Sequence, residues 1–190
     1  RQLLQHQSGF RKGTDVGNLD SMATLPMTCP FGATRSYNNS NISLLRYLIT
    51  SLAYPKDAEA IESKLVRHSF DLYSEKVNTE YSFPYERYIK TAILEKGLVP
   101  LTASCRPEPD LMPKVAKGYA DRNSTKGNLT NTAAEHLAKG NHCAPQGSWY
   151  ISAEMLAHFG RTLLFSNNYL TNVTRNMMFD PQNTCERLGW

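Results

Sequence analysis

The sequence contains no run of about 18 apolar residues, the length that a membrane-spanning helix requires. Its longest apolar stretch, from Ile42 to Tyr54, is interrupted by polar and charged side chains. We therefore expect a buried core helix there and no membrane span. The chain also begins at Arg1, without a methionine or an apolar leader, which predicts that a signal peptide has been removed.

Concentrated charge of one sign is missing as well. The 21 Lys and Arg residues are spread along the chain and offset by 17 Asp and Glu residues, for a net charge of +4. A nucleic-acid-binding surface concentrates its positive charge and interleaves it with stacking aromatic side chains. The sequence therefore predicts no nucleic-acid partner.

Recognisable catalytic and cofactor motifs are absent. There is no Gly-x-Ser-x-Gly, no His-Glu-x-x-His and no phosphate-binding glycine loop. Glu154 and His158 lie one helical turn apart, but two ligands do not make a metal site, so we predict no metal and no cofactor. A site assembled in space from His142, Glu154 and His158 remains the basis of an alternative interpretation, a small extracellular hydrolase.

The four cysteines include no closely spaced pair of the kind that zinc and redox sites use. Their long separations favour disulfides, and we expect sequential pairing, Cys29 with Cys105 and Cys143 with Cys185. Four free thiols in a cytosolic protein are the alternative.

Five Asn-x-Ser/Thr triplets are present, against roughly two expected by chance at this composition. They place candidate glycans on Asn38, Asn41, Asn123, Asn128 and Asn172. With the disulfides, they predict a secreted or surface-displayed glycoprotein. Because Asn41 or Ser43 is expected to cap the first core helix, Asn38 should carry a glycan more reliably than Asn41.

Hydrophobic periodicity predicts a mainly α fold. Residues 1–30 show no apolar face and read as an extended N-terminal arm, followed by a single helical domain at 31–190. We expect four main helices in a compact, disulfide-braced bundle, and a small β element from 97–103 and 147–152 is left open. The expected main helices run from 42 to before Pro55, from 57 to 77, from Ser82 and Pro84 to Gly97, and from Ser152 onward.

Shorter helices are expected at about 109–117 and 131–139, each ending in Lys-Gly. A further helix should run through Leu170, Val173 and Met177.

With no catalytic motif, the sequence favours a non-enzymatic protein that recognises another protein. A ligand, an effector or a receptor-binding surface glycoprotein fits, and its partner would be a cell-surface receptor or host protein. The pattern in 140–150 favours a structural role, in which Cys143 forms a disulfide and Trp149 closes the core; in the functional interpretation this stretch presents His142, Trp149 and Tyr150 to that partner. The third alternative is a carrier whose apolar cavity is lined by Met155, Phe159, Met177 and Met178.

Overall fold

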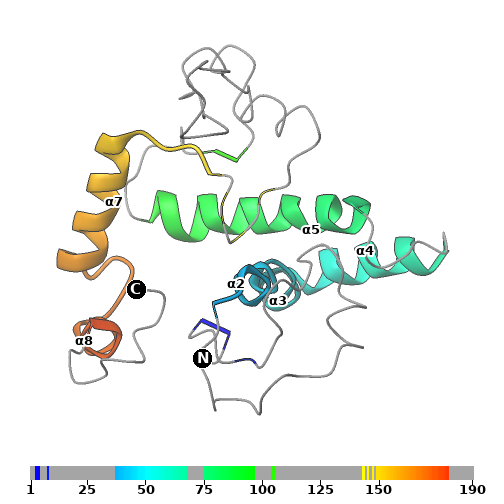
Figure 1. The fold of residues 1–190 in the computed structure, drawn as a ribbon, viewed down its shortest axis with the longest axis horizontal. Coiled ribbons are helices and arrows are strands. Elements are labelled where there is room, and N and C mark those ends of the chain that lie inside the picture. Colours follow the sequence, from blue (N-terminus) through cyan, green and yellow to red (C-terminus); the bar gives the residue numbers. More distant parts are fainter. Residues whose placement is uncertain are drawn as a thin grey trace, which may run out of the picture.

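The computed structural model describes residues 3–4, 8, 37–67, 75–96, 104–105, 143, 145, 147 and 149–179. Within these residues the chain is helical and forms no strand. The elements are, in order, α2 (Asn39–Ser43), α3 (Leu45–Ala53), α4 (Pro55–Arg67), α5 (Glu75–Tyr88), η1 (Ile89–Glu95), α7 (Ala153–Phe165) and α8 (Asn172–Phe179) (Figure 1).

The first core helix starts three residues earlier than predicted. Asn38 has extended backbone and its side-chain oxygen accepts a hydrogen bond from the Ser40 N–H at 2.8 Å. The cap is therefore Asn38, and the prediction of Asn41 or Ser43 is wrong. The helix is interrupted at Leu44, between α2 and α3, and α3 ends at Ala53, before Pro55 as expected.

The buried side of α3 is more polar than its leucine spacing indicates. Arg46 and Thr50 are buried, whereas Leu48 and Leu52 are 47% and 75% exposed. Only part of the apolar stripe predicted for this helix faces the core, where Ile49 packs against the cluster that contains Tyr85. Thr50 faces α5, where its hydroxyl donates to the Tyr81 carbonyl at 3.5 Å.

The long helix predicted at 57–77 is two helices. α4 ends at Arg67, and α5 begins at Glu75 and continues through Pro84, so the predicted start at Ser82 and Pro84 is also wrong. The two helices pack together through Ala58, Ile61, Val77 and Tyr81, with the Tyr47 ring edge-on to Tyr81 at 4.9 Å. This apolar cluster ties α3, α4 and α5 into one unit.

α5 passes directly into η1, a π-helix of seven residues, and together they form one rod across the middle of the molecule (Figure 1). Val77, Tyr81, Tyr85 and Ile89 follow one another at intervals of four, and the next core residue, Leu94, comes after five. A π-turn closes over five residues, so this wider spacing keeps Leu94 on the packed side of the rod.

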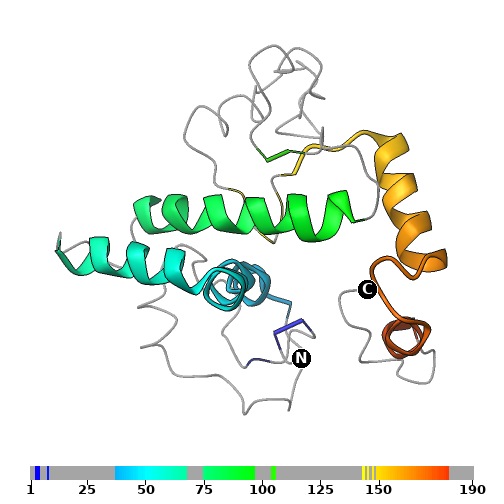
Figure 2. The same cartoon turned by 180° about the vertical axis from the view of Figure 1, so that it is seen from behind.

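The start of α7 agrees with the prediction, and α8 contains the predicted Val173 and Met177 but not Leu170. Ser152 has extended backbone and its hydroxyl accepts from the Met155 N–H at 3.1 Å, which starts α7 as expected. α7 packs on the end of the rod, where Met155 and Phe159 contact Leu94. Figures 1 and 2 show it at the η1 end of the rod, away from α4.

The turn between α7 and α8 is held by one arginine of α8. The Arg175 guanidinium donates to the carbonyls of Leu163, Ser166 and Leu170 and to the amide oxygens of Asn167 and Asn172. A single cation thus satisfies the Leu163 carbonyl in the last turn of α7 and the carbonyl of the C-cap residue Ser166.

The helical class is confirmed, but the four-helix bundle and the N-terminal arm are not. Apart from Leu3, Leu4 and Ser8, the predicted arm lies outside the described residues, as do the helices expected at 109–117 and 131–139. Of the predicted β element, one antiparallel bridge between Ser104 and Tyr150 is seen. No helix in the described part of the chain is long and apolar enough to cross a membrane.

Candidate functional site

An exposed tyrosine stands at the start of α2. The Tyr37 side chain is 66% exposed and its hydroxyl donates to the Asn39 side-chain oxygen at 2.8 Å. The neighbouring Asn38 is buried and occupied as the helix cap. Tyr37 and Asn39 are therefore the two polar side chains that this turn presents to solvent.

Below this turn lies a layer of buried polar groups. Ser40, Asn41 and Ser43 are almost completely buried, and the Ser8 hydroxyl, 33 residues away in sequence, donates to the Asn41 side-chain oxygen. Buried polar groups in folded proteins are almost always hydrogen-bonded. The contact with Ser8 meets this requirement for Asn41, whereas the Ser43 hydroxyl has no hydrogen-bond partner among the described residues.

Two of the predicted glycan sites lie in this buried layer. Asn38 and Asn41 are 5% and 1% exposed, and both side-chain oxygens accept hydrogen bonds. Glycans on Asn38 and Asn41, and the ranking of Asn38 above Asn41, stay predictions. Asn172 is exposed at the start of α8, and its glycan stays a prediction. Asn123 and Asn128 lie outside the described residues.

A second polar centre surrounds a disulfide. Cys105 and Cys143 are bonded to each other, with their Cα atoms 5.1 Å apart. The predicted pairing of Cys105 with Cys29 and of Cys143 with Cys185 is therefore wrong, and Cys29 and Cys185 themselves lie outside the described residues. Spacing along the chain could not reveal this pairing, because the fold brings 105 and 143 together on α5.

Both cysteines are fully buried against Tyr85, and the Trp149 ring lies edge-on to Tyr85 at 6.4 Å. Burial raises the pKa of the Tyr85 hydroxyl to about 12, although the nearby Arg46 cation acts in the opposite direction. Trp149 thus helps to close the core, which is the structural interpretation of 140–150.

Arg46 is a buried cation beside this disulfide. Its guanidinium donates to the Asn78 side-chain oxygen and, at 3.4 Å, to the Cys143 carbonyl, while its Nε–H has no hydrogen-bond partner. The Tyr47 hydroxyl also donates to Asn78, at 2.5 Å. Within the described part of the chain no carboxylate pairs with Arg46, and its hydrogen-bond partners there are neutral groups.

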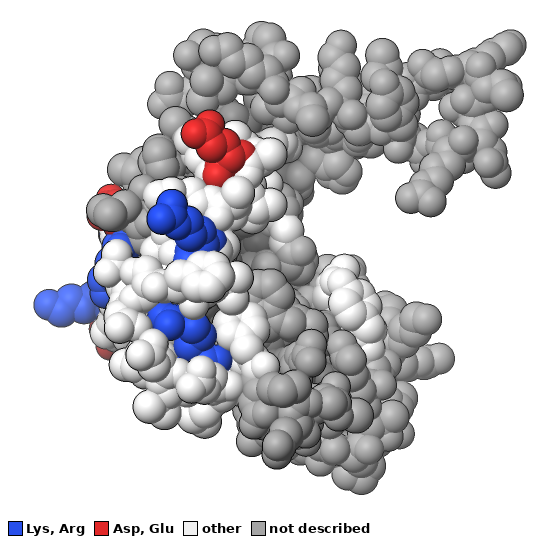
Figure 3. Space-filling model, turned by 90° about the vertical axis from the view of Figure 1, so that its left-hand side faces the viewer, with Lys and Arg blue, Asp and Glu red and all other residues white. Residues whose placement is uncertain are grey.

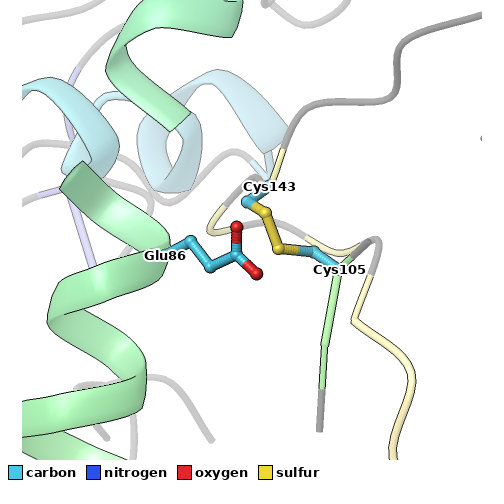
Figure 4. A group of neighbouring side chains, drawn as sticks. All are labelled: Glu86, Cys105 and Cys143. Atoms are coloured by element: carbon cyan, nitrogen blue, oxygen red, sulfur yellow. A yellow bond between two sulfur atoms is a disulfide. The ribbon is translucent and has the colours of Figure 1, made fainter. Parts of the chain in front are cut away.

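Glu86 on α5 points toward the disulfide (Figure 4). Its carboxylate and the two cysteine sulfurs lie within 4.8 Å of one another, and it pairs with Lys90 at 2.9 Å. The bonded sulfurs of a disulfide are not thiolates, so in this oxidised state the three groups do not form a metal site.

Two of the three residues predicted for a hydrolase site lie within the described part of the chain. His142 lies outside the described residues, and Glu154 and His158 are exposed on α7. Neither side chain makes a hydrogen bond or an ion pair within the described ranges. Tyr150 is partly buried, and its backbone forms two hydrogen bonds with the backbone of Ser104.

The carrier interpretation does not fit either. Met155 and Phe159 pack on Leu94, and Met177 is 69% exposed, so these side chains do not line a common cavity. In the view of Figure 3, most of the described side chains are uncharged, and a few basic and acidic side chains lie among them.

Tyr37 was absent from the predicted site residues. The sequence feature that could have identified it is a tyrosine directly before residues 38–43. Those residues are interpreted above as glycan sites and a helix cap. A tyrosine at a helix start can also be a positioned proton donor or acceptor.

The family comparison concerns nearly the whole chain. Residues 1–189 match the family model described as Beta-lactamase, which points to a serine-hydrolase-type family. No curated protein and no solved structure gives a significant match. The match overturns the prediction of a non-catalytic recognition glycoprotein, and the receptor-binding and effector interpretations with it. The chain belongs to the β-lactamase family.

Proposed function

We propose that the protein takes part in hydrolysis of an acyl bond, such as the amide of a β-lactam ring, through a serine acyl-enzyme. The family match over residues 1–189 carries this proposal. Such a reaction needs a nucleophile, a group that moves its proton and donors that hold the carbonyl oxygen.

The Tyr37 turn supplies polar groups suited to the second of these roles. Serine β-lactamases and penicillin-binding proteins carry Ser-x-x-Lys, Ser-Asp-Asn and Lys-Thr-Gly motifs. Here Ser36-Tyr37-Asn38 agrees with the second motif at its first and last positions. Since Asn38 is buried as a cap, Tyr37 and Asn39 are the groups that can reach a substrate. We assign Tyr37 to proton transfer and Asn39 to orienting its hydroxyl.

The nucleophile is not assigned to these 190 residues. Neither Ser-x-x-Lys nor Lys-Thr-Gly occurs in the sequence. Ser8, Ser40, Ser43 and Ser82 are 0–2% exposed and cannot meet a substrate in this fold. The proposal therefore concerns the part that the Tyr37 turn takes in the reaction.

The test is a substitution of Tyr37 by phenylalanine in the full-length protein, assayed with a chromogenic cephalosporin. Loss of a proton-transfer group should lower kcat/KM by roughly 100- to 10,000-fold. Tyr88→Phe removes the hydroxyl of a half-buried tyrosine of α5 and should leave the rate unchanged.

A labelled penicillin, followed by mass mapping, identifies the acylated serine in the same preparation. Absence of both acylation and turnover would overturn the proposed function. Acylation and turnover that survive Tyr37→Phe unchanged would remove Tyr37 from the site and leave the hydrolase assignment standing.

Secretion is proposed on separate grounds. The Cys105–Cys143 disulfide and the exposed Asn172-Val173-Thr174 triplet support an oxidising, extracytoplasmic environment. We also propose that residues 31–190 form a single domain with four main helices, preceded by an N-terminal arm. A protein partner stays a prediction. A protein from its native source with four titratable thiols and a mass insensitive to glycosidase would contradict secretion.

A further inference from the structure

We propose that reduction of the Cys105–Cys143 disulfide creates a binding site for a borderline-soft divalent cation such as Zn²⁺, with Cys105, Cys143 and Glu86 as its ligands. This proposal is independent of the hydrolase assignment. It starts from a cluster that the catalytic proposal does not use.

The ligand atoms are already gathered. Glu86 comes from α5, and the cysteines come from segments 38 residues apart, yet one carboxylate oxygen and both sulfurs lie within 4.8 Å of one another (Figure 4). Two thiolates and one carboxylate match the donor preference of zinc, and three protein ligands leave a fourth position for water. After the sulfur–sulfur bond is broken, the sulfurs need only move apart to reach separate positions around a metal ion.

The surroundings favour a net negative charge at this point. Arg46 is 3% exposed, contacts the Cys143 carbonyl and has no carboxylate partner among the described residues. Two thiolates, one carboxylate and Zn²⁺ together carry a charge of about −1, which the buried Arg46 cation offsets. Lys90, the present partner of Glu86, is partly exposed, so its ammonium group can return to water when Glu86 turns to a metal.

The chemical step balances with a dithiol as the reductant. The dithiol transfers two electrons and two protons to the Cys105–Cys143 bond, which becomes two thiols, and the dithiol closes to its own disulfide. Binding of Zn²⁺ then displaces the two thiol protons into solution. Reoxidation would expel the metal, because a disulfide sulfur is a poor ligand. The site thus belongs to reducing conditions.

The experiment uses the 190-residue protein with Cys29→Ser and Cys185→Ser, which leaves one pair of thiols. The protein is reduced with a phosphine, the metal is added alone, and Zn²⁺ binding is titrated by calorimetry. Co²⁺ reports thiolate ligands through its charge-transfer absorption. We expect one ion per reduced chain and none per oxidised chain.

Two variants decide whether Glu86 is a ligand. Glu86→Gln should weaken Zn²⁺ binding at least about tenfold, since even supporting groups of metal sites contribute 10- to 100-fold. Glu95→Gln, an exposed carboxylate on η1, is the matched control and should leave the affinity unchanged. Circular dichroism monitors helix content after reduction.

Absence of stoichiometric binding, or equal affinity in the two variants, would overturn the proposal. Equal affinity in the two variants is also expected if the two cysteines bind Zn²⁺ in an unfolded chain. Loss of helix content on reduction therefore also contradicts a folded site.

Discussion

Tyr85 lies where α5, the Cys105–Cys143 disulfide and Trp149 meet. Its ring is almost completely buried, and that burial raises the pKa of its hydroxyl to about 12, from 10 for an exposed tyrosine. A raised pKa means that the folded state prefers the neutral phenol. The resulting stabilisation is complete below pH 10 and is lost as the pH rises toward 12.

We therefore expect the wild-type protein to lose about 2 to 3 kcal/mol of unfolding free energy between pH 10 and pH 12 through this one group. Urea denaturation at a series of pH values measures it. Tyr85→Phe should show a flatter profile over this interval, and Tyr88→Phe should follow the wild type. Parallel profiles for wild type and Tyr85→Phe would contradict the assignment.

Single side chains also mark the limit of what the sequence predicts. Ile61 and Val77 are buried as their spacing indicates, but Arg46 is buried within a leucine-rich stretch. Its partners are Asn78 on another helix and a carbonyl 97 residues away. No local pattern contains that information, because a buried cation is stabilised by groups that only the fold brings near.

Two helix ends follow local chemistry closely enough to be predicted from the sequence. Ser152 starts α7, and Pro55 follows the end of α3, because caps and prolines act on neighbouring backbone. The division between α4 and α5 was missed. The apolar rows continue across 57–77, so periodicity alone cannot show that this stretch contributes to two separate helices, α4 and α5.

The Ser152 cap gives a direct test at this scale. Ser152→Ala removes the acceptor for the Met155 N–H and should lower the unfolding free energy by about 1 kcal/mol. Ser152→Asp should restore it, because a carboxylate both caps and interacts well with the helix dipole. Thermal or urea unfolding measures both.

Ser51→Ala, on the exposed side of α3, provides the control for loss of a serine hydroxyl. Since alanine is the better helix former inside a helix, this variant should be neutral or slightly more stable. Equal losses for Ser152→Ala and Ser51→Ala would show that the cap contributes nothing specific.

At the scale of the whole molecule, the Cys105–Cys143 disulfide connects two segments that lie outside the described helices. It closes a loop of 38 residues, so in the loop-entropy model it stabilises the folded state by about 4 kcal/mol. The even cysteine count and the lack of close pairs predict disulfides. Which cysteines pair depends on the fold, which packs Cys105 and Cys143 together against Tyr85 of α5.

Replacing Cys105 and Cys143 by alanine should lower the unfolding free energy by about that amount, measured by urea denaturation without reductant. Reduction of the wild-type protein in the absence of metal should produce a loss of similar size. A double variant within 1 kcal/mol of the oxidised wild type would show that the loop is ordered without the bridge.

The π-helical segment has a consequence for comparing this chain with others. Between Ile89 and Leu94 the rod accommodates one residue more than an α-helix with the same packed positions would hold. A related chain that lacks one residue here can keep both contacts by closing the segment into ordinary α-helix. An alignment gap of one position at 90–93 would therefore record a local insertion, and the two molecules would still superimpose from Trp149 through α7.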